Sequence, residues 1–142
     1  MITSGQCLNK FGRPGTGSEG KYMTLWVVPP ELAQGKLPKR VYCNLMMVEP
    51  LKKAFTNIIK RGLLDQVKEW NGCYLVRQKR GGTSWSMHAW GLAIDINAST
   101  NGFGHKPTMS RELVACFTDT GSFDWGGVWG KPDGMHFQLK NF

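Results

Sequence analysis

Residues 86–96 read SMHAWGLAIDI, and this stretch combines a strand pattern with polar side chains of chemical interest. From Gly91 to Asn97, aliphatic residues alternate with small or polar ones. A period of two is typical of a β-strand that has one face in the core. Asp95 is therefore expected on the face opposite the aliphatic side chains. Ala93, the preceding residue on that face, is small enough to leave room for an ion.

Two histidines and two aspartates stand out as candidate functional residues. His88 precedes Asp95 in the first stretch, and Asp133 and His136 follow far downstream in the sequence DGMHF at residues 133–137. Two imidazoles and one carboxylate can hold a zinc ion while leaving a fourth coordination position open, and a second carboxylate can transfer protons. The pattern predicts a metal site of His88, Asp95 and His136, with Asp133 as the base.

A competing interpretation of Asp95 is a buried ion pair. A buried carboxylate needs a compensating cation, and Arg77 or Arg80 could supply it as well as zinc could. The residues alone leave both possibilities open. The third histidine, His105, lies in a glycine-containing loop beside Lys106, so we expect it on the surface, or at most in contact with a lid.

Composition indicates one globular domain. The 142 residues are 41% hydrophobic and 20% charged, which fits a single unit with its own core. No apolar run approaches the ~20 residues of a membrane span, and residues 1–10 lack the apolar stretch of a secretory signal. We therefore expect synthesis in the cytoplasm, no stable membrane insertion and, by default, a monomer.

The net charge of +8 favours a polyanionic partner such as nucleic acid, anionic lipid or an acidic cell-wall polymer. The basic residues are scattered and do not form a nucleic-acid-binding motif, so we expect no nucleic acid partner. A solubilising basic surface is an equally simple interpretation. The four cysteines contain no Cys-x-x-Cys pair, which argues against a cysteine zinc ribbon and favours buried thiols. Their even number still permits two disulfides.

The expected secondary structure mixes helices and strands without a β-α-β rhythm. Apolar spacing predicts a helix from Pro50 to about Gly62, and Ser110 can cap a second helix over 111–118. The remaining expectations are an irregular segment over 1–24, a strand or entry segment over 41–48, a short helix over 63–70, and strands over 73–77, 91–97, 123–127 and 135–139. The fold class expected is α+β, one domain over 1–142, with a central antiparallel sheet flanked by helices. We expect residues 1–40 to form an irregular N-terminal segment and about 41–142 to form the core that carries the candidate site.

Several motifs resemble one known family. The pattern SxHxxGxAxDI at 86–96 resembles the zinc motif of the D-alanyl-D-alanine carboxypeptidase/L-alanyl-D-glutamate endopeptidase family, which includes vancomycin-resistance D,D-dipeptidases and many phage endolysins. Three further stretches resemble the family. The sequence CYLVR at 73–77 precedes the zinc motif, and WGGVW at 125–129 and DGMH at 133–136 follow it, in the same order as in that family. The resemblance covers roughly residues 40–142 and implies a Hedgehog/D,D-peptidase-like fold.

The resemblance also implies roles for individual residues. His88, Asp95 and His136 correspond to the zinc ligands, and Asp133 corresponds to the general base, for which many members use glutamate. Arg77 corresponds to the arginine that stabilises the oxyanion, with Arg80 as a rival. Ser86 is expected to support the site through hydrogen bonds and not to act as a nucleophile.

By this resemblance the chain is a zinc peptidase that cuts peptidoglycan stem peptides. The aspartate at position 133 and the single small domain favour a phage endolysin that hydrolyses the L-Ala–D-Glu bond and acts on the wall in the periplasm after release. One alternative is a D-Ala-D-Ala carboxypeptidase, in which Arg80 or Lys131 would bind the substrate carboxylate. The other is a non-catalytic, zinc-stabilised wall-binding module.

The tryptophans near the candidate site have two interpretations. Trp85 and Trp90 flank His88, and Trp125 and Trp129 precede Asp133. Such side chains could stack on sugars, but tryptophan in a small domain more often belongs to the core. We therefore expect them mainly in the core.

Overall fold

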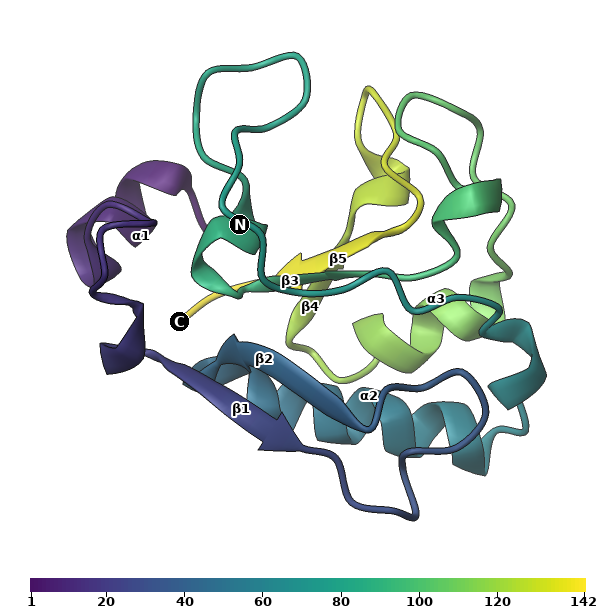
Figure 1. Ribbon diagram of the computed structural model, residues 1–142. Coiled ribbons are helices and arrows are strands. Elements are labelled where there is room, and N and C mark those ends of the chain that lie inside the picture. Colours follow the sequence, from purple (N-terminus) through teal and green to yellow (C-terminus); the bar gives the residue numbers. More distant parts are fainter.

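The computed structural model describes residues 1–142 as an α+β domain with two antiparallel sheets (Figure 1). Strand β1 (Met23–Val27) pairs with β2 (Arg40–Asn44). The second sheet has the order β3-β5-β4, formed by β3 (Ala93–Asp95), β5 (His136–Leu139) and β4 (Phe123–Trp125). The predicted class and the antiparallel pairing are confirmed, although the chain builds two small sheets and not one.

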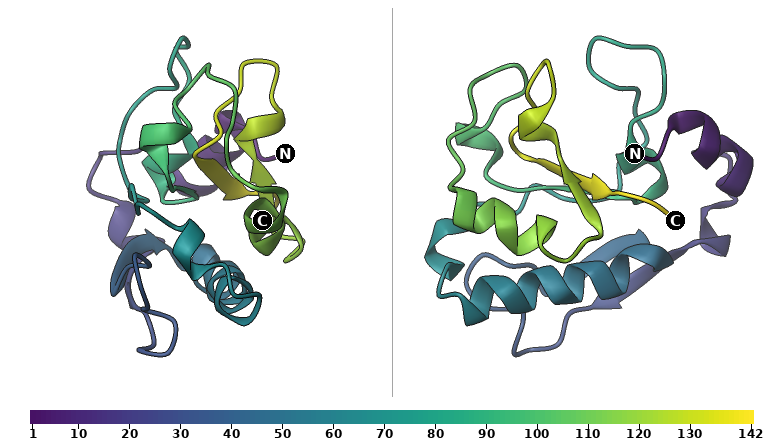
Figure 2. Two further views of the ribbon diagram at one scale, coloured as in Figure 1. Left: turned by 90° about the vertical axis from the view of Figure 1, so that its right-hand side faces the viewer. Right: turned by 180° about the vertical axis from the view of Figure 1, so that it is seen from behind.

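Three α-helices accompany the sheets: α1 (Ser4–Phe11), α2 (Val48–Lys60) and α3 (Arg111–Thr118). Seen from behind, α2 and α3 run along the lower half of the molecule, and α3 packs against α2 and β4 (Figure 2). The long loops over about 77–85, 101–109 and 129–134 rise on the opposite side (Figure 1). None of the helices has the length and apolar character needed to cross a membrane.

The core is one continuous apolar cluster between these layers. The ring of Phe55 on α2 stacks on Trp26 of β1 at 5.8 Å, and Phe117 on α3 stacks on Phe137 of β5 at 4.2 Å. Trp90 is fully buried. The first contact joins the two-stranded sheet to α2 and the second joins β5 to α3, so one face of the three-stranded sheet is turned toward the core.

The helices predicted over 50–62 and 111–118 both form. Ser110 caps α3 by accepting a hydrogen bond from Leu113 N at 3.1 Å, as expected. Helix α2 begins at Val48, two residues before the predicted start at Pro50, and ends at Lys60. The apolar spacing placed its buried face correctly, because Leu51, Ala54, Phe55 and Ile58 are all fully buried.

Three local expectations are wrong. Neither residues 1–24 nor the whole segment 1–40 is irregular throughout, because this part of the chain contains α1 and β1. The segment 63–70 forms only the 3-10 turn Leu64–Gln66, and 73–77 contains no strand. In this last segment Leu75 N and Arg77 O bond to the backbone of 86–88, so individual backbone bonds replace a regular ladder. The four cysteines are free and buried, which confirms the expectation of buried thiols and not the alternative of two disulfides.

Gly91 occupies a position that other residues cannot fill without strain. Its φ of 66° lies in the left-handed region, and a Cβ there would come within 2.7 Å of Asn44 N and 2.6 Å of Met23 Cε. We expect Gly91→Ala to lower the free energy of unfolding by about 2–5 kcal/mol, from backbone strain plus overpacking. Gly121→Ala is the matched control, because its φ is 75° with open space around it. Urea denaturation should show a clearly smaller loss for Gly121→Ala; equal losses would refute the role of the close packing.

Candidate functional site

His88 is placed by a short 3-10 helix, η4 (Met87–Trp90). Ser86 caps η4, since its Oγ accepts a hydrogen bond from His88 N at 3.3 Å. The ring of His88 is fixed by its Nδ1, which lies 2.6 Å from the carbonyl oxygen of Cys73. Because a carbonyl oxygen can only accept, Nδ1 carries the proton. The other nitrogen, Nε2, therefore presents a lone pair.

His136 and Asp95 are brought together by strand register. They are directly opposite each other in the β3–β5 pair, so their side chains share one face of the sheet. His136 Nε2 donates to Gln138 Oε1 at 2.9 Å, which leaves Nδ1 as the unprotonated nitrogen. Each histidine is thus oriented by an oxygen acceptor behind it, an arrangement typical of metal-binding histidines.

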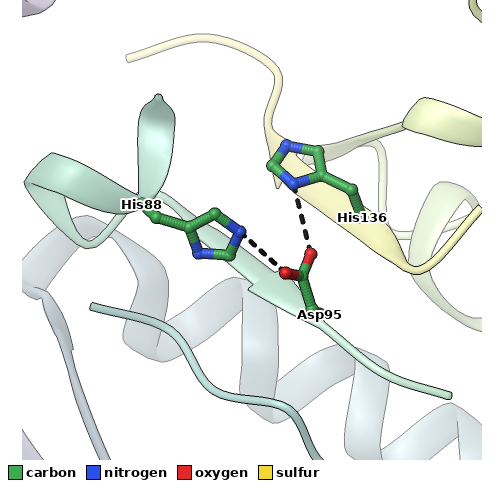
Figure 3. A group of neighbouring side chains, drawn as sticks. All are labelled: His88, Asp95 and His136. Atoms are coloured by element: carbon green, nitrogen blue, oxygen red, sulfur yellow. Dashed lines mark ion pairs between the residues drawn. The ribbon is translucent and has the colours of Figure 1, made fainter. Parts of the chain in front are cut away.

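The three side chains converge on one point (Figure 3). His88 Nε2 lies 3.1 Å from Asp95 Oδ2, and His136 Nδ1 lies 3.3 Å from Asp95 Oδ1. Ligand atoms from the three residues lie within 4.8 Å of one another. Asp95 forms no ion pair with Arg77 or Arg80, and its carboxylate faces only the two histidine rings. The interpretation of Asp95 as an arginine ion pair is therefore wrong.

The nitrogen and oxygen atoms that face one another in this cluster are suitable ligands for a metal ion. His88 Nε2, His136 Nδ1 and Asp95 Oδ1 are buried and have no hydrogen-bond partner. Buried polar atoms without partners are costly, and here three of them direct lone pairs at the same space. A cation in that space would satisfy all three. Two nitrogens and one carboxylate oxygen are ligands that zinc favours.

The carboxylate of Asp95 is held in its charged form. Burial opposes ionisation, but positive charge on the facing rings of His136 and His88, when the nitrogens next to Asp95 carry a proton, outweighs this effect and lowers the pKa of Asp95 below its usual value. A metal cation in the same space would favour the ionised carboxylate in the same way, with both facing nitrogens unprotonated.

Asp133 lies beside the three residues on a tightly fixed loop. Its backbone N–H donates to Gly126 O at 2.9 Å, and Trp125 Nε1 donates to Gly134 O at 2.8 Å. The Asp133 Oδ2 atom is 3.9 Å from His136 Nδ1, while Oδ1 is buried without a partner. Burial raises the pKa of the Asp133 carboxyl above its ordinary value. The carboxyl is therefore positioned to exchange a proton with a molecule bound beside the histidines.

A pocket of about 260 Å³ opens beside the cluster. Ser86, Asp133 and His136 line it, together with cationic, aromatic and apolar side chains. The cations are Arg77, Lys79 and Arg80, and the aromatic and apolar residues are Phe103, Trp129, Met1, Ile2 and Met87; the polar Gln138 completes the lining. The pocket therefore combines a candidate metal site, a candidate base and a positively charged rim.

One comparison with known proteins gives a match. Residues 80–139 match the family model described as D-alanyl-D-alanine carboxypeptidase. The match supports the family suggested by the sequence motifs and, at the level of the family, a peptidase that acts on peptidoglycan. Neither the search of curated proteins nor the search of solved structures gave a match. The matched segment includes His88, Asp95, Asp133 and His136, whereas Arg77 precedes it.

The structure also places the remaining predicted residues. Arg77 and Arg80 both line the pocket. Their positions therefore do not decide which of the two corresponds to the arginine that stabilises the oxyanion in the carboxypeptidase family. Arg77 Nη1 donates to the carbonyl of Gln78 at 3.1 Å. Lys131 is not a lining residue, and its Nζ lies 4.8 Å from the ring centre of Phe103. His105 is exposed and is not among the lining residues.

The tryptophans divide between the two interpretations. Trp90 is fully buried, and Trp85 and Trp125 pack against the core. Trp129 instead lines the pocket, with its ring 5.3 Å from that of His136. The expectation of a core role is therefore wrong for Trp129.

Gln138 is a site residue that sequence reasoning missed, although it lies two positions after His136 and hence on the same face of β5. We expect Gln138→Leu to weaken zinc binding by about 10–100-fold, because the acceptor that orients His136 is lost. Gln138→Glu keeps an acceptor and should bind zinc nearly as well as the unchanged protein. Zinc titration by calorimetry measures both. Gln78→Leu, at an exposed glutamine, is the control; a loss as large as that of Gln138→Leu would contradict the assignment.

Proposed function

We propose that this chain is a zinc-dependent peptidase of the D-alanyl-D-alanine carboxypeptidase/L-alanyl-D-glutamate endopeptidase family that hydrolyses peptidoglycan stem peptides. Within this class we propose a phage endolysin that cleaves the L-Ala–D-Glu bond during host lysis. One observation supports the proposal most directly. Buried nitrogen and oxygen atoms of His88, Asp95 and His136 have no hydrogen-bond partner, and they lie beside the buried carboxyl of Asp133. A role in lysis requires that the enzyme, made in the host cytoplasm, reaches the wall in the periplasm.

In this proposal His88, Asp95 and His136 hold the zinc ion. When bound, zinc supplies Lewis-acid polarisation of the scissile carbonyl and lowers the pKa of water toward 7. Asp133 takes the proton from the attacking water and returns it to the leaving amine, so that the peptide C–N bond breaks without release of a charged amide. Arg77, at the rim of the same pocket, offers a guanidinium to the negative charge that develops on the carbonyl oxygen.

The charge of the pocket supports an acidic substrate. Arg77, Lys79 and Arg80 line it together, and the chain as a whole carries a net charge of +8. Stem peptides of peptidoglycan carry free carboxylates, which such a rim would attract and orient. The same rim could bind the terminal carboxylate of a D-Ala-D-Ala substrate, so carboxypeptidase activity is the second candidate.

Digestion of purified peptidoglycan distinguishes these activities. The protein is incubated with sacculi, with and without a zinc chelator, and the new ends are identified by mass spectrometry. We expect fragments with N-terminal D-Glu, lost with the chelator and restored by zinc. Release of free D-Ala would replace the endopeptidase with the carboxypeptidase. No cleavage by the zinc-loaded protein would overturn both and favour a zinc-stabilised wall-binding module.

A further inference from the structure

The N-terminal segment, residues 1–12, lies against the candidate site although it precedes the family match at 80–139. The chain starts next to η4 at the base of the 77–85 loop, and α1 lies beside it (Figure 1). Ile2 is 5% exposed and lines the same pocket as Asp133 and His136. An apolar side chain from this segment therefore forms part of the wall of the pocket.

Local capping fixes how the segment enters α1. Thr3 Oγ1 accepts a hydrogen bond from Gln6 N at 3.1 Å, and Gln6 Oε1 accepts one from Thr3 N at 2.8 Å. This reciprocal pair is a capping box, which sets the direction of the chain before the helix. Ile2 directly precedes the box. Its position against the pocket is thus held by the helix start and does not depend on a free tail.

The segment is also tied to the element that carries His88. Cys7 on α1 is fully buried, with its Sγ 3.7 Å from Met87 Sδ. Trp90 Nε1 donates to Gly12 O at 2.9 Å. Met87 and Trp90 flank His88 in η4, so contacts from the middle and the C-terminal end of the segment fix it to the short helix of the candidate metal ligand.

We propose that Ile2, with the almost fully buried Met87 beside it, forms the floor of an apolar subsite that receives a small aliphatic side chain of the substrate. The inference rests on the proposed peptidase function. The pocket has apolar lining from Ile2 and Met87 and cationic lining from Arg77, Lys79 and Arg80. A peptide with an aliphatic residue next to an acidic one presents the same two kinds of surface. Ile2 is then a specificity-determining residue that touches the substrate.

A specificity switch tests this subsite. The peptides compared are a stem peptide with alanine before the acidic residue and its analogue with leucine at that position. Removing side-chain volume with Ile2→Ala should raise the ratio of kcat/KM for the leucine peptide over the alanine peptide by about tenfold. Ile2→Val should give a smaller rise. Leu8→Ala, on α1 at a position 39% exposed and outside the pocket, should leave the ratio unchanged.

A binding measurement keeps this test separate from turnover. The Asp133→Asn protein is titrated with the alanine peptide, and the isoleucine δ1-methyl resonances are followed by NMR. We expect the Ile2 methyl to shift, while those of Ile58 and Ile59 on α2 stay in place. If the Ile2 methyl resonance shifts but the unaltered protein does not cleave the peptide, the proposed subsite is supported and the proposed peptidase function is rejected. An unshifted Ile2 methyl in a binding-competent protein, or equal ratios for Ile2→Ala and Leu8→Ala, would overturn the subsite.

Discussion

Asp133→Asn should leave zinc binding intact and lower the rate of peptidoglycan cleavage by roughly 10²–10⁴-fold, the range expected for loss of a general base. Asparagine keeps the size of the side chain but cannot take a proton from water. The three proposed zinc ligands and the hydrogen bonds of the Asp133 backbone to Gly126 are unchanged by the substitution. Zinc content, measured by atomic spectrometry, and the cleavage rate on sacculi check the two parts of the expectation.

The matched control for this substitution is Asp119→Asn. Asp119 lies on the surface, where its carboxylate pairs with Arg61 at 2.8 Å, and an exposed ion pair contributes little. This variant should therefore cleave sacculi at the rate of the unaltered protein. Retention of more than about a tenth of the activity by Asp133→Asn would remove Asp133 from the proposed mechanism.

His136→Ala should abolish both zinc binding and cleavage. The substitution removes one of three ligand atoms, so the loss of zinc affinity should exceed the about 10–100-fold loss expected when only its supporting acceptor is removed. Since zinc binds the folded state, zinc should raise the melting temperature of the unaltered protein and leave that of His136→Ala unchanged. Thermal unfolding with added zinc or chelator measures this difference.

His105→Ala provides the matched comparison, because His105 is the exposed histidine outside the pocket. It should bind zinc and cleave sacculi like the unaltered protein. If His105→Ala lost zinc as strongly as His136→Ala, the assignment of the ligands would be wrong.

The sequence predicted the elements whose signals are local. The alternation around Asp95 and the cap at Ser110 each depend on a few neighbouring residues, and β3 and α3 form there. Because β5 pairs with β3 in antiparallel register, the alternation also placed Asp95 on the face that it shares with His136. The sequence therefore indicated that Asp95 and the histidines could meet as candidate metal ligands.

Other features depend on contacts between distant segments, or on weak signals. The spacing of Thr3 and Gln6 is a capping-box signal, but the glycine-rich residues that follow α1 suggested a loop. The carbonyl of Cys73 that orients His88 is a backbone group, which residue types cannot reveal. The role of Ile2 in the pocket arises from the packing of α1 on η4, and no pattern in residues 1–12 predicts it.

The central claim is that one zinc ion, held by His88, Asp95 and His136, is required for peptide cleavage. The most direct test is to strip the protein with a chelator, add zinc back in measured steps, and follow cleavage of sacculi against bound zinc. The account predicts no cleavage without metal and a linear rise that saturates at one zinc per chain. Cleavage that persists in the stripped protein, or that is indifferent to added zinc, would contradict it.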